Sequence, residues 1–365
     1  ALPRAFFAQR RSYMLFNSVP FLLLVLPTFL LYYLPALHRF QLHVIIISSF
    51  IFYAYNDPPL LLLLLLSIGI NIASSYAVVF GPQGNRRTYA TLGVVANLGI
   101  LLFFKYGPLF GRSFFPETSS IGQFLVSIPL PVGISFFTFQ GISLVVEAYK
   151  GKQVEDYDTI VVRGLVRHGI RIAAFKAFFP QLVAGPVVTA HEFLPQIRTK
   201  YFKDIDRNSA FASLVVGYFL KMVIADNLKD QTFWVTFPYF RDMHSLTLVV
   251  LLFGYSFQIF SDFAGYSLIA IGLAKLFGYD FPINFNFPYI STTFSEFWRR
   301  WHISLSTFLR NFLYIPLGGN RKGGFHTYKN LMLTMVLGGL WHGAAWSYAV
   351  WGFFVLSGYL MTHVL

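Results

Sequence analysis

The sequence predicts an all-α protein that crosses a membrane many times. It is 56% hydrophobic and 12% charged, and its mean hydropathy is +0.58. An ordinary soluble domain carries about a quarter charged residues. Apolar stretches long enough to cross a membrane recur along the whole chain. At about 20 residues per crossing, we expect roughly ten or eleven membrane helices, some of them short, tilted or re-entrant.

The apolar stretches place these helices in chain order. They cover residues 15–34, 60–80, 92–110, 121–146, 211–225, 246–260, 266–277, 331–346 and 349–365, with shorter or interrupted stretches at 44–55 and 170–188. The sequence shows no large soluble domain, so residues 14–365 are predicted to form a single membrane domain. Residues 1–13 precede Met14, a plausible native start, as an extension. The last apolar stretch reaches the end of the sequence, and further helices beyond it are an open alternative.

Composition excludes several classes of function. The 28 Lys and Arg against 15 Asp and Glu leave a net charge of +13, but the basic residues are scattered among loops between apolar stretches. That distribution is typical of membrane-protein loops, so we expect membrane lipids and no nucleic acid as partners. The chain has no cysteine, which excludes disulfides, thiolate metal sites and a cysteine acyl-enzyme. Motifs of serine hydrolases, P-loop ATPases and zinc proteases are absent from the sequence. We expect no bound metal and no permanent cofactor.

One amphipathic helix is predicted to begin at Thr293, three residues before Glu296 in the spacing of a capping box. Apolar residues recur at helical spacing through 294–312, and basic and hydroxyl residues occupy much of the remaining surface. Such a helix lies at the membrane interface or lines a polar cavity, and both alternatives are open. His302 falls on the apolar stripe, so its side chain should face inward.

A second histidine, His342, stands in the apolar stretch 331–346. Gly339 and Gly343 flank it, and this spacing of small residues lets a neighbouring helix or a slender ligand approach the backbone. An ionisable side chain at membrane depth is costly and indicates a functional site. We place the chemistry at His342 and His302, although a structural histidine hydrogen-bonded to a neighbouring helix is the alternative for each.

Other polar and aromatic residues are candidates for substrate binding. Arg299 and Arg300 precede His302 and either anchor the chain at the interface or hold phosphate groups of a coenzyme. Asp262 lies between two apolar runs, where it could pair with an arginine or histidine, structurally or in catalysis. The remaining candidates are Gln258 and the tryptophans close to the two histidines, Trp298 and Trp341.

Several segments together resemble the membrane-bound O-acyltransferase (MBOAT) family, specifically its bacterial alginate O-acetyltransferase branch. The most specific is 297–321, with the core Trp-Arg-Arg-Trp-His-Ile-Ser-Leu-Ser. The others, in the order found in the family, are residues 131–140, 179–186, 258–265 and 340–343.

This resemblance implies a fold, an activity and roles for the two histidines. Members of the family form a ring of helices around a thin central region pierced by a tunnel. The family's catalytic histidine matches His342, and its second histidine matches His302. The implied reaction is acetyl transfer from cytosolic acetyl-CoA across the bacterial inner membrane, for O-acetylation of an exported polysaccharide through a periplasmic partner enzyme. His342 would act as general base on the attacking hydroxyl, or would carry the acyl group itself.

Two other functions fit the same residues. Within the family, the D-alanyl transferase branch takes its acyl group from a carrier protein. Outside it, a transporter of an acyl donor or lipid could use the same polar tunnel and arginines without chemistry.

Overall fold

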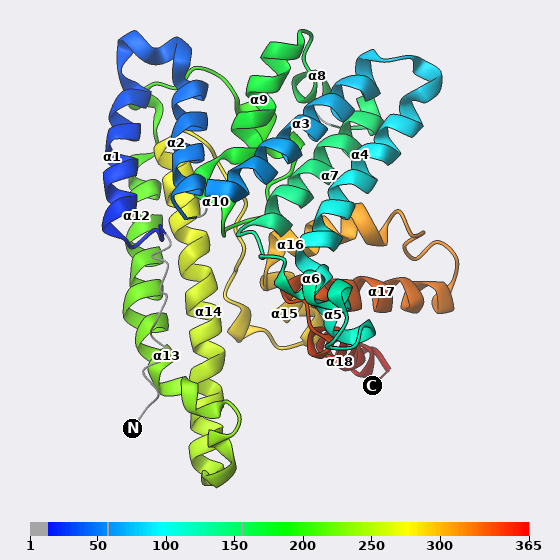
Figure 1. The fold of residues 1–365 in the computed structure, drawn as a ribbon. Helices are drawn as coiled ribbons and strands as arrows, with labels where there is room; N and C mark the ends of the chain where they lie inside the picture. Colours follow the sequence, from blue (N-terminus) through cyan, green and yellow to red (C-terminus); the bar gives the residue numbers. More distant parts are fainter. Residues whose placement is uncertain (1–13, 57, 155, 365) are drawn as a thin grey trace. The chain divides into compact units, whose positions relative to one another are not determined.

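The computed structural model describes residues 14–56, 58–154 and 156–364 (Figure 1). Within these ranges the chain forms helices and no strand, and an isolated bridge joins Phe285 to Trp301. The predicted all-α class is therefore confirmed. The described residues divide into two compact units that interleave in sequence. Unit 1 takes its residues from Ala1–Gly69, Val166–Gly185 and Gln196–Asp280, and unit 2 from Ile70–Leu165, Pro186–Pro195 and Phe281–Leu365.

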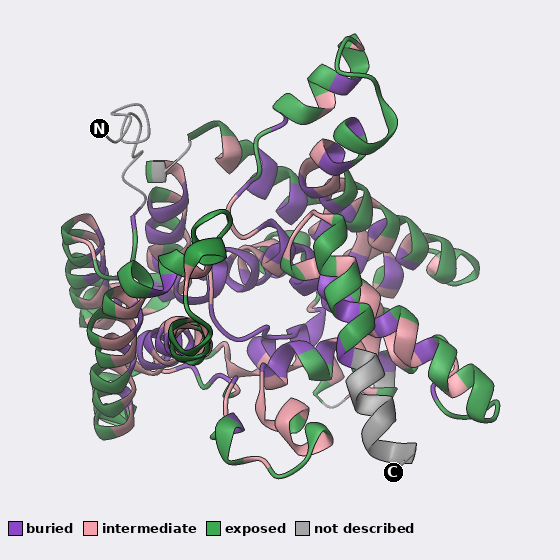
Figure 2. Cartoon of the chain, turned by 90° about the horizontal axis from the view of Figure 1, so that it is seen from below, coloured by how far each residue is buried: buried purple, intermediate pink, exposed green. Residues whose placement is uncertain are grey.

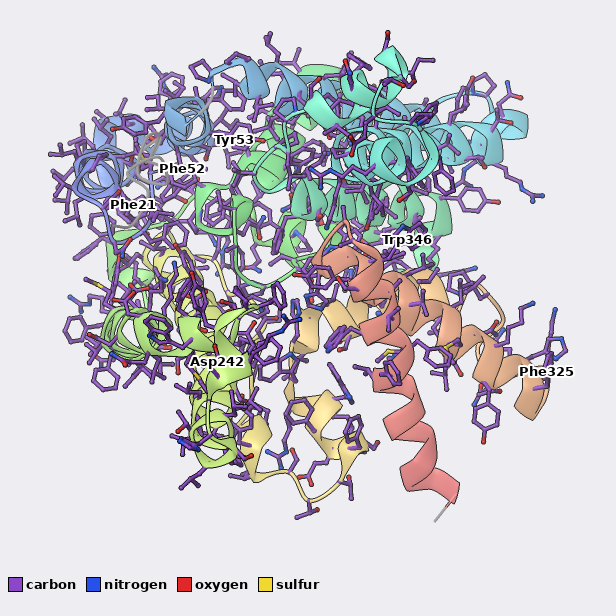
Figure 3. All side chains as sticks on the ribbon, turned by 60° about the horizontal axis from the view of Figure 1, so that its bottom comes forward. Phe21, Phe52, Tyr53, Asp242, Phe325 and Trp346 are labelled. Atoms are coloured by element: carbon purple, nitrogen blue, oxygen red, sulfur yellow. The ribbon has the colours of Figure 1, made fainter. Side chains whose placement is uncertain are left out.

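Unit 1 is built around a long helical hairpin. Helices α12 and α14 lie side by side in Figure 1, and α14 is 32 residues long. Aromatic rings fill the space between the N-terminal helices of the unit: Phe21 and Phe52, both labelled in Figure 3, lie 6.0 Å apart between ring centroids. The main helices of unit 1 are α1 (Val19–Tyr33), α2 (Gln41–Asn56), α9 (Leu165–Ala177), α10 (Phe179–Leu182), α12 (Arg207–Tyr218), α13 (Asp226–Thr232) and α14 (Ser245–Leu276), while α3 (Pro58–Phe80) has residues in both units.

Unit 2 carries both candidate histidines. Its apolar core is a cluster of Phe139 and Ile142 from α7, Val187, and Leu305 and Phe308 from α16. The helices of this unit are α4 (Arg86–Leu101), α5 (Gly107–Phe114), α6 (Ser120–Ser127), α7 (Ile134–Lys150), α8 (Tyr157–Ile160), α11 (Ala190–Phe193), α15 (Phe294–Arg300), α16 (Ile303–Leu309), α17 (Gly324–His342) and α18 (Trp346–Val364).

Three π-helices interrupt this α-helical pattern in the described residues. They are Leu102–Tyr106, Phe219–Ala225 and Arg310–Tyr314. Each contains one basic residue: Lys105, Lys221 and Arg310, respectively. A π-helix inside an α-helix is rare and is frequent at functional sites, so these basic residues merit attention beside the histidines.

Five helices of the described chain are long and apolar enough to cross a membrane. Large apolar side chains are exposed along them, and such surfaces suit contact with lipid. Figure 2 shows in green the exposed residues of the described chain. These helices span Pro35–Tyr55, Pro58–Phe80, Gln83–Phe114, Arg207–Val235 and Ser245–Leu276, and Val19–Tyr33 is apolar but shorter. The chain is thus a multi-pass membrane protein, with fewer long apolar helices than the ten or eleven expected.

The number of long helices differs from the expected number in part because two expected stretches form one helix and others are divided or end early. Residues 246–260 and 266–277, expected as two helices, are the single helix α14. The stretch 121–146, expected as one helix, is divided into α6 and α7. Pro129 and Pro131 lie at that division, and proline both lacks a backbone donor and restricts the residue before it. The stretch 331–346 ends its helix at His342.

Three predictions about the fold are not tested by the described helices. The extension 1–13 lies outside the described residues. A single membrane domain over residues 14–365, and a ring of helices around a tunnel, stay predictions.

Candidate active site

His302 lies at a sharp break between two short helices. Thr293 caps α15 as predicted, because its Oγ1 accepts a hydrogen bond from the Glu296 N–H at 3.1 Å. The single helix expected over 294–312 is wrong: α15 ends at Arg300, and His302 has φ of +45° in the left-handed region. That conformation is uncommon for any residue other than glycine. Asn284 stabilises the break, since its carbonyl oxygen accepts from the Ile303 N–H at 2.9 Å and its Oδ1 from Ser304 Oγ at 2.6 Å.

The break turns the His302 side chain into the protein. Only 2% of this residue is exposed, which confirms that it faces inward. Backbone conformations of this kind persist only where the surroundings enforce them, and they cluster at active sites. The left-handed backbone at His302 therefore supports a functional position.

His342 is the last residue of α17. Gly343 follows in an extended conformation and ends the helix. A Cβ at Gly339 would collide with the Tyr348 carbonyl oxygen, and a Cβ at Gly343 with the Tyr348 ring. The small residues thus admit the neighbouring helix α18, one of the two alternatives predicted from their spacing. Trp346, labelled in Figure 3, begins α18, and its Nε1 donates to Ser113 Oγ at 2.8 Å.

The two histidines meet in one cavity. Their ring centroids are 6.2 Å apart, and the centroid of the Trp351 ring lies 5.3 Å from that of His342. Both line a cavity of about 50 Å³ together with Trp298 and the glycines Gly338 and Gly339 of α17. His342 keeps accessible surface in this open cavity, whereas His302 is enclosed. The exposed ring is therefore the one that a reactant can reach.

The surroundings of both histidines favour the neutral form. Burial lowers the pKa of His302 well below its ordinary value, and the nearby His342 adds to the effect. Desolvation by the surrounding protein also lowers the pKa of His342, to about 4, and the positive charge of Lys105 contributes to this shift. A neutral imidazole can accept a proton, so the electrostatics favour a base at this position.

A second cavity of about 220 Å³ adjoins the first. It shares Trp298 and Ser306 with the histidine cavity, and Arg299 and Arg310 contribute two guanidinium groups. Hydroxyl groups of Ser306 and Thr307 also line it. Guanidinium and hydroxyl donors in one cavity form a suitable environment for phosphate.

Arg300 does not belong to this second cavity. Its Nη2 and Nε donate to Glu296 Oε1 at 2.8 and 3.0 Å, and its Nη1 donates to the Asn286 carbonyl oxygen at 3.1 Å. The structure therefore separates the two adjacent arginines: Arg299 lines a cavity, and Arg300 joins α15 to the segment before it.

The tryptophans of the site have different surroundings. The Nε1 atoms of Trp298 and Trp341 are both buried and have no hydrogen-bond partner among the described residues, but only Trp298 lines the histidine cavity. A buried donor of this kind calls for an explanation, and a bound ligand is one. The Trp341 ring stacks on Phe139, with centroids 5.9 Å apart, and packs against the core of unit 2.

Asp262 and Gln258 belong to unit 1, whereas the histidines belong to unit 2. The Lys221 Nζ donates to Asp262 Oδ1 and to Asp226 Oδ1, both at 2.6 Å. The Oε1 of Gln258 accepts from Thr232 Oγ1 at 3.4 Å. Asp262 thus pairs with a lysine, and not with an arginine or a histidine, the two partners considered from the sequence. Among the residues that the structure describes, no group of three His, Cys, Asp or Glu could hold a metal ion.

Sequence reasoning missed Lys105, Tyr106 and Arg310. Lys105 is the one charged residue in the apolar stretch 92–110, and that isolation was a signal. Arg310 is one of the basic residues on the polar side of the predicted helix over 294–312, and nothing in its spacing indicates a cavity.

Comparisons with known proteins show the family of the chain. The family model "MBOAT, membrane-bound O-acyltransferase family" matches residues 119–362. The chain is 40% identical over 351 residues to a probable alginate O-acetylase of Pseudomonas putida, covering 93% of this chain and 68% of that protein. It is 36% identical to a peptidoglycan O-acetyltransferase of Helicobacter pylori, covering 93% and 68%, and 27% identical to a teichoic acid D-alanyltransferase of Bacillus subtilis, covering 87% and 79%.

The match does not extend over the full length of these relatives. This chain covers 64% of a probable alginate O-acetylase of Pseudomonas aeruginosa, to which it is 40% identical. It spans about two thirds of the length of the alginate O-acetylases that it matches.

Proposed function

The chain belongs to the membrane-bound O-acyltransferase family, and from this premise we propose that it transfers an acetyl group to an acceptor hydroxyl, in support of the O-acetylation of an exported polysaccharide. The observation that carries the proposal is the pairing of an enclosed histidine, His302, with an accessible one, His342, in one cavity. The family consists of O-acyltransferases, and the relatives named for alginate and peptidoglycan suggest a glycan acceptor.

His342 is the general base of the proposed reaction. Its neutral ring takes the proton of the acceptor hydroxyl as the hydroxyl oxygen attacks the thioester carbonyl carbon. The new C–O bond forms, the C–S bond breaks, and the leaving thiolate takes the proton back from His342 to give the free thiol. Base catalysis contributes about 10²–10⁴-fold, and alignment of both reactants in the cavity supplies a further part.

His302 and Trp298 complete the proposed site. His302 is enclosed beside His342 and orients a reactant, which suits its fixed backbone. The buried Nε1–H of Trp298 is the donor that we assign to the carbonyl oxygen of the thioester, where negative charge develops during attack.

The proposed acyl donor is acetyl-CoA. Its phosphate groups would bind in the second cavity, where Arg299 and Arg310 supply two positive charges next to the histidine cavity. Arg299 keeps the role predicted from the sequence, and Arg310 takes the role first given to Arg300, because Arg300 pairs with Glu296.

We also propose that the protein lies in a bacterial inner membrane. The acetyl group would then reach the polysaccharide through a periplasmic acetyltransferase partner. The apolar surfaces of the long helices support contact with membrane lipids. The acetyl branch is favoured over the D-alanyl branch because identity is 40% to the alginate O-acetylase and 27% to the D-alanyltransferase. A transporter without chemistry would have no need of a neutral histidine pair in the cavity.

The test is acetyl transfer from radiolabelled acetyl-CoA by the purified protein, with the partner acetyltransferase and polysaccharide supplied. We expect His342→Ala to lose at least about 10²-fold in kcat while folding and donor binding persist. His302→Ala should lower kcat less. Near-normal turnover by His342→Ala would falsify the assignment of the base. Transport of the donor into proteoliposomes that survives this substitution would favour the transporter.

A further inference from the structure

The C-terminal end of α17 is held by side chains from another helix. The last four carbonyl groups of an α-helix lack donors within the helix. Helices often satisfy them with a left-handed residue after the end, but Gly343 is extended here, with φ of −163°. The Tyr106 hydroxyl donates instead to the Leu340 carbonyl oxygen at 2.9 Å, and the Lys105 Nζ donates to the Trp341 carbonyl oxygen.

The second of these bonds acts on the peptide group that carries His342. The Trp341 carbonyl belongs to the peptide bond between Trp341 and His342, which is planar. Fixing that oxygen therefore fixes the plane from which the His342 Cα and side chain extend. His342 is itself the last residue of the helix, so the Trp341 carbonyl is among those without a donor inside the helix.

Lys105 is in turn fixed on several sides. It is 8% exposed, and its Nζ also donates to Ser135 Oγ at 3.0 Å, near the start of α7. The Nζ lies 5.5 Å from the centroid of the Trp341 ring. A buried amine held by a hydroxyl, a carbonyl and an aromatic ring is a rigid support.

We propose that Lys105, with Tyr106 beside it, is a positioning residue that holds His342 in its reactive orientation through the carbonyl groups of Trp341 and Leu340. The proposal rests on the function proposed for His342, and it concerns a lysine that does not itself line the histidine cavity. The π-helix Leu102–Tyr106 contains both donors and brings them to α17 from one turn.

The test compares Lys105→Met with a control variant, Asn330→Ala, which lies in the helix that carries His342. Asn330 is buried in α17, and its Nδ2 donates to the carbonyl oxygens of Leu317 and Gly319 at 3.3 and 2.9 Å. Each variant therefore removes hydrogen bonds between a side chain and backbone carbonyls: Lys105 donates to a carbonyl of α17, and Asn330 donates from α17 to carbonyls of the segment before it. Only Lys105→Met removes them beside His342.

Two measurements are made on each full-length variant in detergent. Hydrogen exchange should become at least about tenfold faster in peptides covering 338–345 for Lys105→Met, and Asn330→Ala should leave these peptides unchanged. In the acetyl-transfer assay, Lys105→Met should lower kcat by about 10–100-fold, as expected for a misplaced catalytic group, with donor KM within about twofold of wild type. Tyr106→Phe should show a smaller loss in both measurements.

A double-mutant cycle separates positioning from general stability. If Lys105 acts through His342, adding Lys105→Met to His342→Ala should change the residual rate by less than about twofold. Unchanged exchange in 338–345, or a kcat equal to that of Asn330→Ala, overturns the proposal. Faster exchange in Lys105→Met together with an inactive wild type would leave the restraint on His342 standing and would reject the proposed function instead.

Discussion

The ring of His302 lies 6.2 Å from the ring of His342, centroid to centroid, although one residue precedes α16 and the other ends α17. Each histidine stands where a helix is interrupted, His302 by a left-handed backbone and His342 by an extended glycine. Side chains at helix interruptions can converge in a way that two continuous helices at the same positions would not allow. The pairing therefore depends on both interruptions.

The lowered pKa of His342 predicts the acid side of the pH profile. A base works when it is neutral, so kcat/KM should stay level as the pH falls through 6.5 and should decline only toward about 4. An unperturbed histidine would lose activity near pH 6.5. The measurement is kcat/KM from pH 4 to 8, and a decline centred near 6.5 would contradict the described surroundings of His342.

The same shifts affect stability in a defined direction. Both histidines have a lower pKa in the folded protein than in the unfolded chain. The unfolded chain therefore binds more protons as the pH falls below 6.5, and stability decreases from there toward the folded pKa values. Melting temperatures across this range should fall less in His302→Gln than in the wild type, because glutamine does not titrate.

The two adjacent arginines should have separable effects. Arg299→Ala and Arg310→Ala each remove a charge from the second cavity, and each should raise the KM for acetyl-CoA by about tenfold or more, since a charged hydrogen bond contributes about 1.5–3 kcal/mol. Arg300→Ala removes the ion pair with Glu296 and should lower the melting temperature while KM stays near normal. The reverse pattern would return the phosphate role to Arg300.

Trp298→Phe tests the donor assigned to the thioester oxygen. The substitution removes the buried Nε1–H but keeps an aromatic ring, so kcat should fall by about 10²–10³-fold, the loss typical of one oxyanion donor. Trp346→Phe is the control. It also removes an indole N–H, which donates to Ser113 Oγ, but Trp346 lines neither cavity. Equal losses in the two variants would argue against a direct role of Trp298.

Neighbouring glycines in α17 should respond differently to alanine. A Cβ at Gly339 would meet the backbone of α18 at Tyr348 and Gly352, which cannot easily retreat. Gly339→Ala should therefore destabilise the protein by about 3 kcal/mol, at the upper end of overpacking. A Cβ at Gly338 meets only the end of the Leu309 side chain, at 3.1 Å, so the melting temperature of Gly338→Ala should stay close to wild type. Similar melting temperatures for both variants would contradict the packing of α17 on α18.

Sequence patterns predicted the class of fold and singled out the two histidines that share one cavity, but they did not predict the local breaks. Apolar length identified membrane helices, and periodicity placed His302 inside. The periodicity argument assumed one continuous helix, however, and the left-handed backbone at His302 depends on Asn284, which no spacing rule connects to it. Likewise, Arg299 and Arg300 are the same residue type, so the sequence does not say which of them forms an ion pair. The folded chain shows that Arg300 pairs with Glu296, one turn earlier. Long-range partners of this kind require the folded chain.

The π-helix at Leu102–Tyr106 has a consequence for sequence variation in this chain. A π turn accommodates one residue more than an α turn, and one residue corresponds to about 100° of helix rotation. Deleting a single residue there would restore an ordinary helix and turn every later side chain of that helix by this angle relative to α4. Lys105 and Tyr106 would then no longer face the carbonyls that they bind on α17. The proposed positioning of His342 therefore depends on the length of this segment as well as on its composition.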